Sequence, residues 1–150
     1  MIVVVQRVSN ASITIEKDVT ASIKHGIVVL VGIEDADTRE DVEWLATKVV
    51  NLRIFNDENG VMNLSLKEVG GEAMIVSQFT LHSSTKKGNR PSYIKAAKPP
   101  HAIPVYESFI DEVSKLLGVR VKTGVFGADM KVSLTNDGPV TIIIDTKNKV

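Results

Sequence analysis

Short apolar segments rich in Val and Ile, separated by turn-forming residues, recur along almost the whole chain. Runs of this kind are typical of strands, and the alternation on either side of Lys17-Asp18 predicts a hairpin. A further run, at 73–81, begins apolar and turns polar at its end. Together these patterns predict strands over residues 2–8, 12–16, 19–23, 26–32, 52–55, 62–66, 73–81, 119–126, 131–134 and 140–145.

Two stretches instead space their apolar residues as a helix does. The first should start at Asp37, a good N-cap with Glu40 three residues later. Its apolar positions are Val42, Leu45, Ala46 and Val49. The second is predicted over 104–117, with Pro104 in its first turn and Gly118 ending it.

Helices and strands do not alternate regularly, which argues against a doubly wound parallel sheet. We therefore predict the α+β class: a single domain over residues 1–150, built from a mostly antiparallel, curved sheet or barrel with two packed helices.

The composition excludes several kinds of site. The 150 residues include no cysteine, which rules out disulfides, thiol catalysis and cysteine zinc sites. The three histidines lack ligand spacing, so we expect no metal and no cofactor. No apolar run approaches the roughly 18 residues that cross a membrane, and we find no signal peptide. We expect a cytoplasmic protein that binds no membrane.

Positive charge is unbalanced by acidic residues in one part of a chain whose formal net charge is zero. Between Ala73 and Tyr106 there is no acidic residue. The basic residues in that interval are Lys86, Lys87, Arg90, Lys95 and Lys98. Such a block indicates either a local phosphate-binding face or a solvated, lysine-rich loop.

Three short segments could carry chemistry. Ser77-Gln78-Phe79-Thr80 ends an apolar strand and could orient an ester carbonyl, or it could be a strand end that meets solvent. Gly138-Pro139 is a plausible cis bond or an ordinary hairpin turn. Gly127-Ala128-Asp129-Met130 places a flexible thioether at a bend, where Met130 could line a site for a flat base or fill the core. Motifs of NTPases, serine hydrolases, zinc proteases and dinucleotide-binding enzymes are absent.

In this order, the three segments resemble those of D-aminoacyl-tRNA deacylases, which remove D-amino acids wrongly attached to tRNA. The resemblance covers nearly the whole chain. It begins with Val5-Gln6-Arg7-Val8 and includes Leu52-Arg53-Ile54-Phe55. It is sharpest at Ser77-Gln78-Phe79-Thr80-Leu81, Phe126-Gly127-Ala128-Asp129-Met130 and Asn136-Asp137-Gly138-Pro139-Val140-Thr141.

The resemblance implies a homodimer whose active site is shared between the subunits, with tRNA as the partner and no DNA. It implies that Ser77, Gln78 and Thr80 are catalytic and that Phe79 and Met130 bind substrate, Met130 near the terminal adenosine. Gly138 and Pro139 would reach into the other subunit's site as substrate-binding residues. Arg7 would support that element.

No histidine lies in the matched motifs, so no evident base would deprotonate Thr80. We therefore expect Thr80 to position the ester while the substrate's own 2′-OH assists attack by water. If Gly138 and Pro139 form a wall that rejects L side chains, glycyl-tRNA should also be cleaved. Lys86, Lys87 and Arg90 would bind tRNA phosphates.

Two other functions fit the same residues. A noncatalytic tRNA-binding module would use the basic face without turnover. A hydrolase of small D-amino-acid esters would need no RNA.

Overall fold

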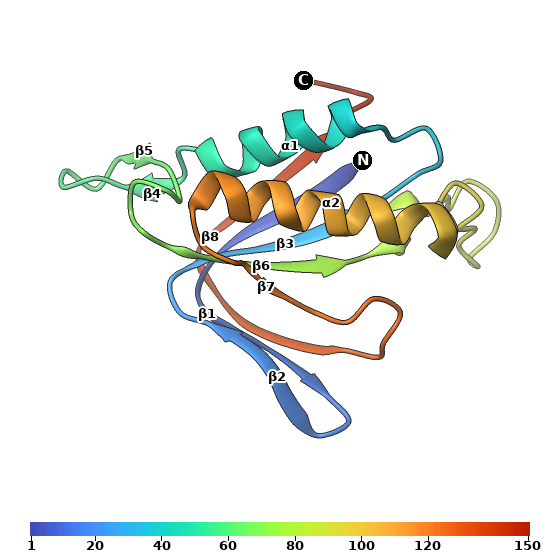
Figure 1. The fold of residues 1–150 in the computed structure, drawn as a ribbon, viewed down its shortest axis with the longest axis horizontal. Helices are drawn as coiled ribbons and strands as arrows, with labels where there is room; N and C mark the ends of the chain where they lie inside the picture. The colour runs from blue at the N-terminus through green and yellow to red at the C-terminus, as the bar shows by residue number, and fades with distance from the viewer.

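One long N-terminal strand organises the sheet. The computed structural model describes residues 1–150, and in it β1 (Ile2–Ile15) pairs antiparallel with β2 (Asp18–Ile23), β3 (Gly26–Gly32) and β8 (Lys131–Asp145). Parallel pairing then adds β6 (Glu72–Ser77) to β3, and β7 (Lys122–Thr123) to β6. Figure 1 shows that the resulting six-stranded sheet curves strongly.

The curvature arises because β1 exchanges one neighbour for another along its length. Its first half, from Ile2 to Val8, lies between β3 and β8, whereas its second half, from Ala11 to Ile15, lies between β2 and β8. Valine and isoleucine dominate these strands, and their branched side chains pack well on a pleated surface. A cluster including Val8, Ile13 and Met74 fills the concave side of this second half.

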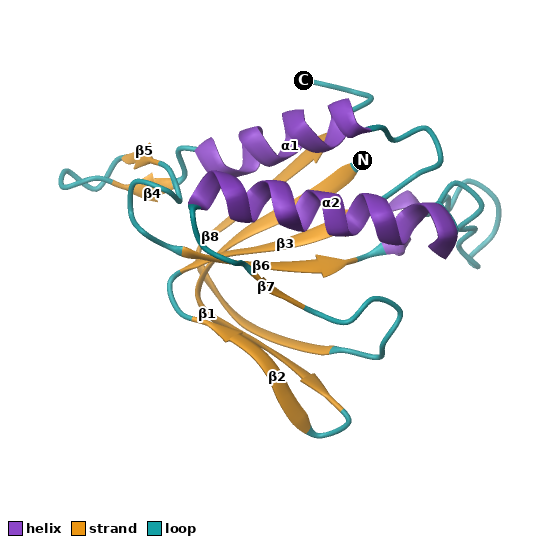
Figure 2. Ribbon diagram, in the orientation of Figure 1, coloured by secondary structure: helices purple, strands orange, loops and turns teal.

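Two helices cover one face of the sheet (Figure 2). α1 (Arg39–Asn51) and α2 (Pro99–Leu117) contact each other and enclose the main apolar core against β1, β3 and β6. α1 contributes Leu45 and α2 contributes Phe109, both fully buried. After α1, β4 (Phe55–Asn56) and β5 (Met62–Leu64) form a small separate hairpin. The predicted fold class is confirmed. Neither helix is both long enough and apolar enough to cross a membrane.

Several predicted strand boundaries are wrong. Residues 2–8 and 12–15 belong to the single strand β1, which ends one residue before the predicted bound at 16, and residues 131–134 and 140–145 belong to the single strand β8. The predicted break at Asn136–Pro139 is absorbed as a bulge, because β1 supplies a continuous partner on both sides of it. The strands predicted at 62–66 and 119–126 are shortened to β5 and β7, and the strand predicted at 52–55 is replaced by the two-residue β4, which overlaps it only at Phe55.

The run at 73–81 also divides. Its last part is not a strand but a short 3-10 helix, η1 (Phe79–His82). The Gln78 N–H makes the last ladder-like bond, to the Val31 carbonyl at 2.7 Å, and the Leu81 N–H then turns back to the Gln78 carbonyl. The strand ends because its partner β3 ends at Gly32.

Both helix starts differ from the sequence prediction. Thr38, not Asp37, is the N-cap of α1, in a capping box with Asp41. α2 begins at Pro99 rather than Pro104, because Pro99 and Pro100 suit the first turn, where no helical N–H bond is needed. Ala102 in that first segment is buried, and the helix continues through the internal Pro104.

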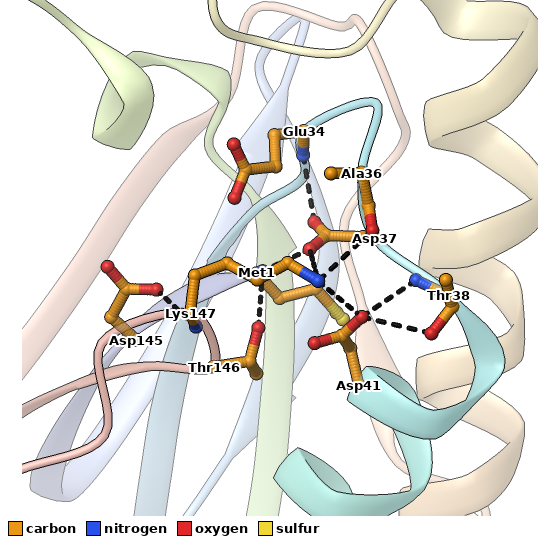
Figure 3. Close-up of polar contacts among 9 residues, drawn as sticks. All are labelled: Met1, Glu34, Ala36, Asp37, Thr38, Asp41, Asp145, Thr146 and Lys147. Atoms are coloured by element: carbon orange, nitrogen blue, oxygen red, sulfur yellow. Dashed lines mark hydrogen bonds and ion pairs between the residues drawn. The ribbon is translucent and has the colours of Figure 1, made fainter.

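Asp37 instead belongs to a cluster of charges that joins the start of β1, the segment after β8 and the loop before α1 (Figure 3). The α-amino group of Met1 donates to the Asp37 carboxylate, and both groups are fully buried. The same amine donates to Thr146 Oγ1 at 2.8 Å. Lys147 closes the cluster by donating to Asp41 Oδ2 at 2.7 Å.

This cluster should make stability depend on pH in acid. Partial burial works to raise the pKa of Asp41, but hydrogen bonds from Lys147 and Thr38 outweigh it and hold that pKa well below its usual value. A carboxylate with a lowered pKa in the folded state contributes fully to the free energy of unfolding when the pH is above its unfolded pKa of about 3.9. That contribution is lost as the pH falls below this value. In urea unfolding, the stability difference between wild type and Asp41→Asn should therefore narrow below about pH 4. Asp35→Asn, at an exposed position, is the control; a difference for Asp41→Asn that does not change with pH would contradict the expectation.

Candidate active site

A cavity of about 310 Å³ opens where the C-terminal ends of β3 and β6 meet the start of α2 and the loop between β7 and β8 (Figure 1). Most of its lining is apolar, with polar groups at one side, as is usual for small-molecule sites. The lining residues are Val31, Ile33, Val76, Ser77, Gln78, Phe79, Ala97, Ala102, Phe126, Gly127, Ala128, Asp129, Met130 and Val132.

The end of β6 supplies the polar side of this cavity. Ser77 is the last strand residue and Gln78 follows it, both half-buried. The Gln78 side-chain amide donates to Thr80 Oγ1. Thr80 itself sits in η1 and does not line the cavity, whereas Phe79 lines it and leaves 55% of its surface exposed.

The opposite wall comes from the loop before β8. Met130 lines the cavity and packs against the smaller apolar cluster. Its sulfur lies only 2.3 Å from where a Cβ on Gly124 would stand, so the absence of a side chain at Gly124 leaves Met130 its place. Phe126 completes this wall and packs on the ring of Tyr106, whose hydroxyl donates to the Ile75 carbonyl at 3.0 Å.

The close approach of Gly124 and Met130 gives a test of this wall. Gly124→Ala should push the flexible Met130 side chain into the cavity and narrow it, with little loss of stability because a thioether can move. We expect KM for a substrate that occupies this cavity to rise several-fold, with kcat little changed. Gly124→Ala combined with Met130→Ala should recover much of the loss; a double variant that is no better would show that Met130 is not the group displaced.

Gly138 and Pro139 do not line the cavity of their own chain. Between the β1–β8 pairs Gln6–Thr141 and Val8–Asn136, four residues of β8 face the single residue Arg7. The strand therefore bulges outward, and the exposed Gly138-Pro139 bond in the bulge is cis.

Arg7 holds the base of this bulge. It is 7% exposed, and its Nε donates to the Asp137 carbonyl at 2.9 Å while Nη1 donates to the Ile54 carbonyl at 2.6 Å. The Asp137 carboxylate lies 3.6 Å from the same Nε. One buried guanidinium thus ties the bulge to the segment after α1.

The cavity holds no evident general base. Its only ionisable lining residue is Asp129, whose exposed carboxylate pairs with Lys131 at 2.9 Å. His82 ends η1 and is buried, and its Nε2 has no hydrogen-bond partner. No group of three or more His, Cys, Asp or Glu side chains is placed to hold a metal ion.

Comparisons with known proteins agree with these motifs. The family model for D-Tyr-tRNA(Tyr) deacylase matches residues 4–145. The D-aminoacyl-tRNA deacylase of Parabacteroides distasonis is 66% identical over 146 residues, covering 97% of each chain, and that of Flavobacterium psychrophilum is 63% identical over 149 residues, covering 99% of each. The chain belongs to the D-Tyr-tRNA(Tyr) deacylase family. The family inferred from the sequence motifs is confirmed, and with it the enzyme class, an ester hydrolase.

Solved structures extend the comparison. A structure of "c-Myc DNA Unwinding Element Binding Protein" is 40% identical, covers 97% of this deacylase-family chain and 98% of its own, and has a TM-score of 0.91. A "probable eukaryotic D-amino acid tRNA deacylase" is 18% identical with a TM-score of 0.83, covering 95% and 97% of the two chains, and shares the fold.

The cavity of this deacylase-family chain also includes residues that sequence reasoning missed. Val31 lies in β3 and Ile33 follows that strand, whereas Ala97 precedes α2 and Ala102 lies in its first turn. These side chains are small or apolar, and the local sequence does not distinguish such residues in a cavity wall from those in the core. The signal available in the sequence is the pair Ala96-Ala97 between two lysines, and the structure buries both alanines.

The basic residues lie outside the cavity. Lys86, Lys87 and Arg90 are exposed in the loop between η1 and α2. That loop is closed by two backbone hydrogen bonds between Ser84 and Ser92, at 2.8 and 2.9 Å. That Lys86, Lys87 and Arg90 bind tRNA stays a prediction.

Proposed function

We propose that this chain hydrolyses the ester bond of D-aminoacyl-tRNA and releases free D-amino acid and tRNA. The observation that carries the proposal is the placement of Ser77, Gln78 and Phe79 at the polar side of the one cavity that Met130 also lines. The family membership and the relatives' names support the same substrate class. Such a substrate would place the protein in the cytoplasm.

The geometry favours a positioning role for Thr80. Its Oγ1 accepts a hydrogen bond from the Gln78 amide, which leaves the hydroxyl proton free to donate to a substrate oxygen. The first N–H groups of a helix have no partner within it, so those of Phe79 and Thr80 can also face a developing oxyanion. With no base beside Thr80, the substrate's 2′-OH would assist the attacking water.

The terminal adenosine would occupy the cavity against Met130. Its apolar lining and its size suit a flat base, and Phe126 supports the same wall. The 3′-ester would then reach the polar side at Ser77 and Gln78.

Rejection of L-amino acids would require a second copy of the chain. Gly138 and Pro139 are exposed and lie outside the cavity of their own subunit, so they can act as a chiral wall only in a partner's site. β8 pairs with β1 alone, and Ile143 on it is 69% exposed, which is a surface suited to a homodimer contact. In such a dimer the L side chain would clash with the partner's bulge, whereas glycine would not.

Hydrolysis of matched D-Tyr-tRNA, L-Tyr-tRNA and glycyl-tRNA tests the activity. Wild type should release D-tyrosine and glycine and spare the L-ester. Thr80→Ala should slow the reaction by about a hundredfold, the usual effect of losing one oxyanion donor, without abolishing it. Binding of tRNA without release from any ester would instead establish the noncatalytic module. Equal cleavage of small D-amino-acid esters that lack adenosine would indicate the hydrolase that needs no RNA.

Mixing two impaired chains tests the shared site. Thr80→Ala and Pro139→Ala each damage a different half of it. In a heterodimer one site would be wild type at both positions and the other would carry both changes. Mixing after mild dissociation should therefore restore part of the selective activity, about a quarter of the wild-type value for random pairing of subunits. No recovery, in a mixture shown to contain heterodimers, would mean that Pro139 does not act across subunits.

A further inference from the structure

An exposed group of ring and aliphatic side chains lies beside the cavity. Phe79, which lines the cavity, meets the ring of Tyr93 edge-on, with centroids 5.1 Å apart and planes at 74°. Ile94 follows Tyr93 and is 86% exposed, the most exposed large apolar side chain before the C-terminal residue. We call Tyr93 and Ile94 the platform; Phe79 connects it to the cavity.

The backbone beneath the platform is anchored. The Ala96 N–H donates to the Tyr93 carbonyl at 3.1 Å, and the Ala97 N–H donates to the Ile33 carbonyl at 2.9 Å. Ala96 also forms a bridge with Glu34, and both alanines are buried. The platform is therefore held at a defined place next to the end of β3, where the cavity opens.

Positive charge precedes and follows the platform along the chain and is not neutralised by the protein. Lys86, Lys87, Arg90, Lys95 and Lys98 are all exposed. None of them is in an ion pair, whereas other lysines and arginines pair with carboxylates, as Lys131 and Arg120 do. The absence of any acidic residue between Ala73 and Tyr106 makes this face attractive to phosphate groups.

We infer that the platform binds the unpaired nucleotides that precede the terminal adenosine at the 3′ end of tRNA. Their bases would stack on Tyr93 and Ile94 while the flanking cations contact their phosphates, the combination typical of surfaces that bind single-stranded nucleic acid. This inference rests on the proposed function, since the terminal adenosine in the cavity is what brings the preceding nucleotides over Phe79. Charge complementarity favours this occupant over an apolar protein partner.

Two substrates separate the platform from the catalytic site. D-Tyr-tRNA spans both, whereas D-tyrosyl-adenosine reaches only the cavity. For Tyr93→Leu, which keeps an apolar contact with Phe79, we expect kcat/KM for D-Tyr-tRNA to fall about tenfold, the size expected for losing one stacked base. Ile94→Ser should cause a smaller fall. Neither should change kcat/KM for D-tyrosyl-adenosine by more than about twofold.

Val119→Ser is the matched control, because Val119 is 62% exposed and lies beyond the C-terminal end of α2. Equal losses on both substrates, or no loss on D-Tyr-tRNA, would overturn the platform. An altered oligomeric state of the Ile94→Ser variant would also overturn the inference, because the platform would then be a contact between subunits. If wild type cleaves neither substrate, the proposed function itself fails, and binding of a short single-stranded RNA relative to a blunt duplex still tests the platform.

Discussion

Replacing Arg7 with methionine is expected to destabilise the protein and, if the proposed function holds, to weaken the proposed discrimination between D- and L-esters. The guanidinium is buried and donates to two backbone carbonyls from distant segments, those of Asp137 and Ile54. Methionine fills similar space but leaves both acceptors without a donor. At about 1–3 kcal/mol for each of the two carbonyls left unsatisfied, the free energy of unfolding should fall by about 2–6 kcal/mol.

Loss of Arg7 should also affect activity, because Arg7 holds the bulge that contains Gly138 and Pro139. A bulge of four residues opposite one has few ladder bonds of its own, so loss of the Arg7 contact should let Gly138 and Pro139 move. Under the proposed function, L-Tyr-tRNA cleavage should rise relative to D-Tyr-tRNA cleavage by about tenfold or more.

Arg7→Lys is the informative companion to this variant. A lysine keeps the charge but cannot direct two fixed N–H groups at two carbonyls, so both effects should be intermediate. Urea unfolding and paired D- and L-ester assays measure them. A destabilised Arg7→Met protein that still rejects L-esters would show that the position of the bulge does not set chirality.

A methyl group on Gly26 should be more damaging still to folding. A Cβ at that position would stand 1.8 Å from the Glu72 carbonyl oxygen and within 2.8 Å of the Glu72 carbonyl carbon and nitrogen. All three are backbone atoms of β6, paired in parallel with β3 at this register. No side chain can rotate away, so the two strands must separate at the start of their pairing.

We expect Gly26→Ala to lose about 4 kcal/mol or more, beyond the usual cost of overpacking, and to accumulate largely as insoluble protein. Lys24→Ala is the control, since that exposed side chain lies nearby and the hydrogen bond to Glu72 uses the Lys24 backbone. Solubility on expression and urea unfolding of any soluble fraction provide the measurement. A Gly26→Ala protein as stable as Lys24→Ala would mean that β3 and β6 are not paired at this register.

Local sequence patterns were sufficient to predict those elements whose bounds depend mainly on neighbouring residues. The runs at Gly26–Gly32 and in β2, and the apolar spacing of α1, predict those elements at nearly their observed bounds. The class of the fold follows from their order. The polar end of β6 and the bend at Met130 were also recognisable as possible site residues, and both line the cavity.

The predicted boundaries were wrong where the end of an element depends on a residue that is distant in the sequence. Nothing near Asp37 indicates that its carboxylate pairs with the α-amino group of Met1, so the capping role fell to Thr38. Nothing near Asn136 indicates that a turn-like segment continues as one strand along β1. Side-chain and turn preferences act over a few residues, whereas these outcomes depend on residues more than thirty and more than a hundred positions away.

The sequence by itself determined the alternating and buried strands, the two helices, the segment without acidic residues and the motifs of the family. Only the tertiary structure decided that Gly138 and Pro139 stand outside their own cavity, that Arg7 ties their bulge to Ile54, and that Phe79 and Tyr93 meet beside the cavity. The physical reason is that periodicity and local conformational preference are written into neighbouring residues. A cavity and a bulge exist only once sheet register has brought separate segments together.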